Sequence, residues 1–229
     1  MPRVVYQKEA WDLKAGFNVA GDNDSGRGIK IYPAVEGGYL VNSGMRVYLG
    51  FEGDVEMNTF ESMARENPWL TRGFDLRNTE KSADFYGGAR IKLIDDLNLN
   101  VKASYARLND LTFITNDITD STRFNILYDD ETVDRLTVSS SLNFEKKNLI
   151  RSALSFDYYN YGLGTLAEAW HRPEFKLDFN NTFYPMKDLV FTVDFYYMGG
   201  LIGLNGETAQ AVDLPDIFDL NLSGRYSFN

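Results

Sequence analysis

The stretch that decides the fold is residues 217–229, with the sequence IFDLNLSGRYSFN. From Phe218 onward an apolar side chain stands at almost every second position, and polar side chains fill the positions between. Successive side chains of a β-strand point to opposite faces, so this pattern predicts a strand with one apolar and one polar face. The apolar row ends in two aromatic residues, Tyr226 and Phe228.

The same alternation recurs along the chain and predicts ten strands in all. Each is close to the roughly 9–11 residues that a tilted strand needs to cross a bilayer. The sixth strand either begins at Leu136 or extends back through the acidic residues 129–131. The predicted strands cover residues 10–20, 29–41, 45–55, 84–93, 97–107, 136–144, 150–161, 174–184, 189–197 and 217–229.

The connections between these strands alternate in length. Those after the first, third, fifth, seventh and ninth strands are long and polar, and the others are a few residues each. Outer-membrane barrels have this topology, with short periplasmic turns at one end and longer extracellular loops at the other. Residues 1–229 are therefore predicted to form a single all-β domain, an antiparallel transmembrane β-barrel of about ten strands in a bacterial outer membrane. An even strand count would bring both chain ends to the periplasmic side.

A soluble all-β domain is the alternative. In such a domain, long and short connections need not alternate along the chain.

Composition excludes other classes. The net charge is −10, and no basic stripe is present to bind nucleic acid. The chain has no cysteine and therefore no disulfide framework. No apolar run approaches the length of a membrane helix, and the first residues lack the apolar core of a signal peptide. A mean hydropathy of −0.33 suits barrel strands, which give only half their positions to lipid.

Three segments resemble a known family: residues 58–93 (NTFESMARENPWLTRGFDLRNTEKSADFYGGARIKL), 169–200 (AWHRPEFKLDFNNTFYPMKDLVFTVDFYYMGG) and 212–229 (VDLPDIFDLNLSGRYSFN). They are similar to the C-terminal barrel portion of the TonB-dependent-receptor-like outer-membrane proteins of Bacteroidetes-type bacteria. The resemblance implies a transport or solute-binding barrel. A complete receptor of that kind has a plug domain and about 22 strands. The predicted strands are then either the last part of a larger barrel or a small barrel of their own.

The polar positions of the strands carry charges of both signs, which are predicted to face the interior. In a closed barrel of ten strands they would pair and fill a narrow lumen, whereas in a larger barrel they would line a wider lumen and could contact a solute. These residues are Asp12, Lys14, Glu36, Arg46, Glu52, Arg90, Lys92, Lys102, Arg151, Asp157, Lys176, Asp178, Asp194, Asp219 and Arg225.

Other candidate sites are weaker. A rim protease could use His171, which Glu168 and Glu174 flank, as a general base with a carboxylate partner. No aspartate neighbours His171 in the sequence and no serine stands out as the nucleophile, so a role as a loop or interfacial residue is favoured. One histidine and no cysteine make a zinc site implausible. Asp22 and Asp24 have part of the character of a calcium loop, without its terminal glutamate.

Loop residues are given structural roles. The acidic residues Asp129, Asp130, Glu131 and Asp134 are predicted to be solvated. Trp69 and Trp170 could face carbohydrate or lipid, and anchoring at the membrane interface is the favoured role. No catalytic residue, metal or cofactor is therefore predicted.

The sequence thus favours an outer-membrane β-barrel component for transport or solute binding, without catalysis. Its predicted partners are the lipid bilayer and an unknown small solute or protein. The alternative is a structural or adhesive surface protein, in which the barrel is an inert anchor and the loops at 57–82, 109–134 and 201–216 bind a partner.

Overall fold

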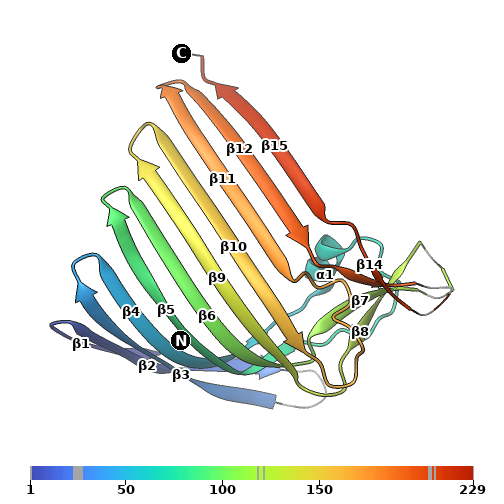
Figure 1. Ribbon diagram of the computed structural model, residues 1–229. Coiled ribbons are helices and arrows are strands. Elements are labelled where there is room, and N and C mark those ends of the chain that lie inside the picture. Colours follow the sequence, from blue (N-terminus) through green and yellow to red (C-terminus); the bar gives the residue numbers. More distant parts are fainter. Residues whose placement is uncertain are drawn as a thin grey trace.

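The computed structural model describes residues 2–22, 28–117, 119–120, 122–205, 208 and 210–228 (Figure 1). The chain is nearly all β, with a single short helix among the described residues. In chain order the elements are β1 (Arg3–Lys8), β2 (Trp11–Asp22), β3 (Gly28–Asn42), β4 (Met45–Glu56), α1 (Phe60–Glu66), β5 (Thr79–Ile94), β6 (Leu97–Asn109), β7 (Thr112–Asn116), β8 (Phe124–Tyr128), β9 (Val133–Lys146), β10 (Ile150–Gly162), β11 (Phe175–Met186), β12 (Leu189–Gly199), β13 (Ile202–Leu204), β14 (Ala211–Asp213) and β15 (Ile217–Tyr226).

One antiparallel sheet of 11 strands forms the body of the molecule, in the order β1-β2-β3-β4-β5-β6-β9-β10-β11-β12-β15. Figure 1 shows it as a curved wall, with the short turns along one end of the strands and the long connections gathered at the other. The sheet is not closed, because β1 and β15 are its two edges and do not pair with each other. The predicted all-β fold and the sorting of connections are confirmed.

The prediction of ten strands is one too few, because the sheet has 11. β1, which precedes the first predicted strand, pairs with β2 from Arg3 opposite Gly16 to Lys8 opposite Trp11. Its adjacent apolar residues Val4 and Val5 break the alternation that marks the other strands, which is why the pattern missed it. The sixth predicted strand does not extend through residues 129–131, since β9 begins at Val133.

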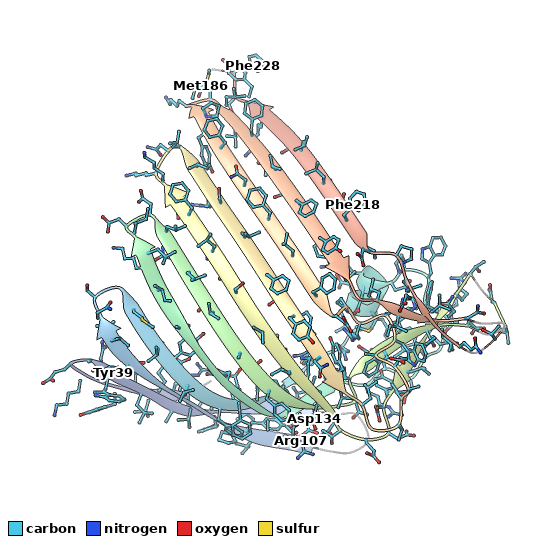
Figure 2. All side chains as sticks on the ribbon, in the orientation of Figure 1. Tyr39, Arg107, Asp134, Met186, Phe218 and Phe228 are labelled. Atoms are coloured by element: carbon cyan, nitrogen blue, oxygen red, sulfur yellow. The ribbon has the colours of Figure 1, made fainter. Side chains whose placement is uncertain are left out.

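The two faces of the sheet differ as the alternation predicts. On one face, large apolar side chains are exposed, as at Leu49 and Phe218, each 74% exposed. Aromatic pairs lie on this face near the short turns, with ring centroids 4.5 Å apart for Trp11 and Tyr39 and 4.7 Å apart for Tyr226 and Phe228 (Figure 2). An exposed apolar band with aromatic residues at its border is the lipid-facing surface of an outer-membrane barrel.

The long connections are folded rather than simply polar. Thr59 caps α1, and its hydroxyl accepts from the backbone of Ser62 while the Ser62 hydroxyl accepts from the backbone of Thr59. β7 pairs with β8, and β13 pairs with β14. No helix in the described ranges has the length and apolar character needed to cross a membrane.

A small hydrophobic core holds these connections to the end of the sheet. Phe113 of β7 and Val133 of β9 are fully buried, and Trp170 is 7% exposed. They pack with Ala106 and Leu108 of β6. The role predicted for Trp170 at the membrane interface is therefore wrong, because its ring is inside this loop core.

Candidate functional site

The charged residues predicted to face the interior lie on one face of the sheet. Cross-strand partners share a face, and so do residues two apart along a strand. One ladder row joins Arg46, Arg90 and Asn100 and continues to Asp178 and Asp219. The parallel rows that include Asp12, Lys14 and Lys102 belong to the same face, opposite the exposed apolar side chains.

Part of the set forms a network of ion pairs near the short turns. The Arg46 guanidinium donates from Nε to Asp12 Oδ1 at 2.9 Å and from Nη2 to Glu36 Oε1 at 3.0 Å. Lys14 Nζ also donates to Glu36 Oε1, at 3.0 Å. A second network lies further along the strands, where Lys81 Nζ is 3.3 Å from a Glu52 carboxylate oxygen.

The rest of the set behaves differently. Lys92 and Arg151 pair with carboxylates near the turns, at Asp95 and Glu145. Within the described part of the chain, the other members form no ion pair: Arg90, Lys102, Asp157, Lys176, Asp178, Asp194, Asp219 and Arg225.

Long side chains on this face lie flat against the sheet because glycines stand beside them. A Cβ on Gly88 would lie 2.6 Å from the Tyr48 hydroxyl, and one on Gly50 would lie 2.3 Å from the Tyr86 ring. The Tyr48 hydroxyl thereby crosses β5 and reaches Asn100 Oδ1 on β6, at 3.4 Å. These side chains cover the wall of the sheet without projecting far from it. The alternation rule identified the charged positions of this face but not the glycines and tyrosines that shape it.

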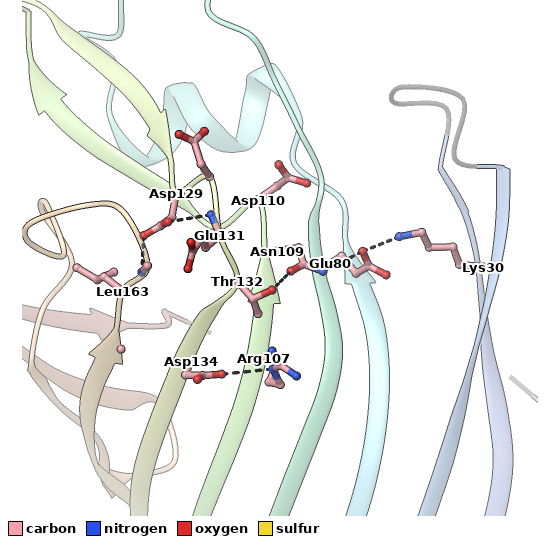
Figure 3. A pocket seen from close by; sticks show the side chains of 13 residues that line it. Lys30, Glu80, Arg107, Asn109, Asp110, Asp129, Glu131, Thr132, Asp134 and Leu163 are labelled. Carbon is pink, nitrogen blue, oxygen red and sulfur yellow. Dashed lines mark hydrogen bonds and ion pairs between the residues drawn. The ribbon is translucent and has the colours of Figure 1, made fainter.

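A polar pocket of about 870 Å³ lies at the loop end of the sheet (Figure 3). Acidic side chains outnumber basic ones in its lining. Lys30 pairs with Glu80, and Arg107 Nε is 3.5 Å from Asp134 Oδ1. The pocket is lined by Lys30, Glu80, Arg107, Asn109, Asp110, Asp129, Asp130, Glu131, Thr132, Asp134, Gly162, Leu163 and Gly164. Sequence reasoning singled out the acidic residues 129–134 but did not predict that they line a pocket.

Asp129 organises one side of this pocket. Its carboxylate accepts backbone N–H bonds from Glu131 at 3.0 Å, Gly164 at 3.0 Å, Thr165 at 2.9 Å and Leu166 at 3.2 Å. Burial opposes its charge, but these donors outweigh that effect and lower the pKa of Asp129 to about 2. The prediction that Asp129 is a solvated loop acid is wrong, because the side chain is a buried structural anion.

The candidate catalytic histidine is also placed in the loop packing. His171 stands edge-on to the Phe124 ring at 5.6 Å between ring centres, and its backbone N–H donates to the Ile202 carbonyl. Its Nε2 is buried without a partner among the described residues, and burial lowers its pKa. This is the environment of a packed neutral imidazole. Of the calcium-like stretch, Asp22 is the last residue of β2, and Asp24 lies outside the described residues.

Arg172 connects two other segments of the loop end by polar contacts. Its Nε donates to the Thr112 carbonyl at 2.8 Å, and its Nη1 is 3.7 Å from Glu66 on α1. Arg172→Met should therefore lower the stability of the loop core by about 1–2 kcal/mol, because the buried carbonyl loses its donor while the aliphatic stem is kept. Amide hydrogen exchange in β7 would measure the loss. Arg65→Met, which removes an exposed ion pair of α1, is the control and should have no effect there. Equal exchange in both variants would contradict the assignment.

No protein-family model matches the chain. No curated protein matches it either. Solved structures do match. The pyoverdine outer membrane receptor FpvA of Pseudomonas aeruginosa PAO1 superposes with a TM-score of 0.65 at 11% identity, over 98% of this chain and 34% of the receptor. The fold is that of an outer-membrane receptor barrel wall.

Two further receptors give the same result. The siderophore receptor PiuA of Acinetobacter baumannii has a TM-score of 0.59 at 11% identity, over 96% of this chain and 35% of its own. The ferric-catecholate import receptor Fiu of E. coli K12 has a TM-score of 0.59 at 10% identity, and the match covers 97% of this chain and 37% of Fiu. The chain thus spans about a third of the length of these receptors. The shared fold supports the predicted location in the bacterial outer membrane, and the resemblance seen in the sequence is confirmed at the level of the fold.

Proposed function

We propose that this chain is a section of the wall of an outer-membrane transport or receptor barrel of the TonB-dependent type, without catalysis. In this proposal the apolar face contacts lipid, and the polar face lines the passage or binding space for a solute. The similarity to solved receptors for siderophores supports a transport role. The observation that carries the proposal is the polar face itself, where charged and aromatic side chains of neighbouring strands lie flat on the wall of the sheet.

An inert anchor would have a different interior. Its charges would pair across a narrow lumen and exclude water. On the described polar face, ion pairs form within one strand, between adjacent strands, or across one intervening strand. The carboxylates of Asp178, Asp194 and Asp219, on β11, β12 and β15, form no ion pair among the described residues.

Water access to adjacent residues of β6 tests the proposal. Because the chain contains no cysteine, Ser104→Cys and Ala103→Cys each introduce a unique thiol, at similar depth on opposite faces. In outer membranes, a membrane-impermeant maleimide should label the Ser104 variant and leave the Ala103 variant unlabelled. Labelling of neither thiol would favour the filled anchor, and labelling of Ala103→Cys alone would reverse the assignment of the faces.

A further inference from the structure

Two tyrosine rings on the polar face carry a cluster of positive charge. The rings of Tyr48 and Tyr86 are 6.3 Å apart between centroids, edge to face. The Arg90 guanidinium lies 5.0 Å from the centre of the Tyr48 ring, and the Lys102 ammonium lies 4.3 Å from that of Tyr86. Arg46 approaches the same Tyr48 ring at 5.6 Å. Cations over ring faces are held in place by the ring quadrupole.

The positive charge of this cluster is not balanced locally. Arg46 is neutralised by Asp12 and Glu36, and Glu36 is shared with Lys14, so these four charges cancel. Arg90 and Lys102 form no ion pair within the described ranges, although the Asp12 carboxylate interacts electrostatically with Arg90. Together with these two cations, the four paired side chains carry a net formal charge of about +2.

The register places a further cation, Arg90, directly beside Arg46. Arg46 and Arg90 are direct cross-strand partners, and like charges in that position repel. Asn100, opposite Arg90, accepts from the Tyr48 hydroxyl through Oδ1, which leaves its amide N–H groups to donate. Cations and amide donors thus converge on one part of the polar face, where Arg90 is exposed, Lys102 and Asn100 are half-buried, and the Tyr48 ring is buried beneath them.

We propose that Tyr48, Tyr86, Arg90 and Lys102, with Asn100, form a binding station for a small solute with two or more carboxylate or phosphate groups. Arg90 and Lys102 lie on adjacent strands two residues apart in register, so their Cα atoms are separated by roughly 8 Å. Two anionic groups of one small molecule can reach both. The proposal rests on the proposed function, since it requires a polar face that is open to solute.

The acidic pocket at the loop end does not prevent an anionic solute from binding at the station. Along β6, Lys102 and Arg107 are five residues apart, or roughly 17 Å. The Debye length in physiological salt is about 8 Å, so the field of the pocket is largely screened at the station.

Citrate and acetate are the probes, titrated calorimetrically into the folded full chain in detergent. Citrate should bind with an affinity that falls as salt is raised, and acetate should bind at least tenfold more weakly. Arg90→Gln and Lys102→Gln should each weaken citrate binding about three- to tenfold, and the double variant should abolish it. Lys176→Gln removes an unpaired charge from the same face outside the station and should leave binding unchanged.

The conservative variant Arg90→Lys should keep most of the affinity, whether or not the double variant folds. The inference is overturned if citrate does not bind the native chain, if the single variants bind it normally, or if Lys176→Gln weakens binding as much as they do. If Ser104→Cys is labelled from water while citrate fails to bind, the station is wrong and the proposed function stands.

Discussion

Asp129→Ala should lower the stability of the loop cap, meaning the folded connections at the end of the sheet, by about 3–5 kcal/mol. The reason is that four backbone N–H groups lose a buried, charged acceptor, and an unsatisfied buried donor costs about 1–3 kcal/mol. Hydrogen exchange at the amides of Gly164, Thr165 and Leu166 should accelerate by two orders of magnitude or more, since about 1.4 kcal/mol corresponds to tenfold. Slow exchange of these amides would contradict the assignment.

Asp130→Ala is the matched control, because it removes a neighbouring carboxylate that is exposed. It should leave exchange at these amides unchanged. A similar loss in both variants would indicate that total loop charge, rather than the bonds of Asp129, stabilises the cap.

The same carboxylate predicts a pH dependence of the cap. The folded pKa of Asp129 is about 2, below its ordinary value of 3.8, so its contribution to stability is complete above about pH 5. As the pH falls from about 5 through the folded pKa, the native chain should lose this contribution progressively. The Asp129→Ala variant should lack that part of the acid sensitivity.

Gly88→Val should destabilise the sheet by about 2–3 kcal/mol, in the range of overpacking a close contact. A Cβ at position 88 would lie 2.3 Å from the backbone carbonyl oxygen of Val101 and 2.6 Å from the Tyr48 hydroxyl. The neighbouring strand and the ring must both shift to admit it. Urea unfolding of the chain in detergent, followed by tryptophan fluorescence, would measure the loss.

Gly37→Val is the control, on β3, where a Cβ would meet nothing within 4 Å. It should be neutral or slightly stabilising, since valine favours strands. If both variants unfold at the same urea concentration, Tyr48 does not lie across Gly88 and the flat lining of the polar face is not formed.

Period-two alternation was sufficient to predict the fold, because a strand between lipid and a polar interior must alternate. The ten strands and their two faces follow from it. The pattern does not identify strands that do not separate apolar from polar surroundings. β1 lacks the pattern, and β7 is packed on both faces: Phe113 lies in the loop core, and Ile114 packs in a second cluster with Met63 and Leu70.

The candidate site was predictable only in part. Charged positions on the polar face follow from the alternation, but their pairing depends on register, which brings Arg46 between Asp12 and Glu36. The roles of Asp129 and Trp170 depend on contacts between connections distant in sequence, such as the bond from Gly164 to Asp129. No local pattern encodes such contacts.

The most direct test of a wall with one lipid face and one solute face is a spin-label scan of β6 from Leu99 to Tyr105 in the protein reconstituted into bilayers. Collision rates with oxygen, which concentrates in lipid, and with a water-soluble nickel chelate should alternate with a period of two. Oxygen access should peak at the odd positions and nickel access at the even ones. Rates that do not alternate, or that favour nickel on both faces, would contradict a membrane-spanning wall.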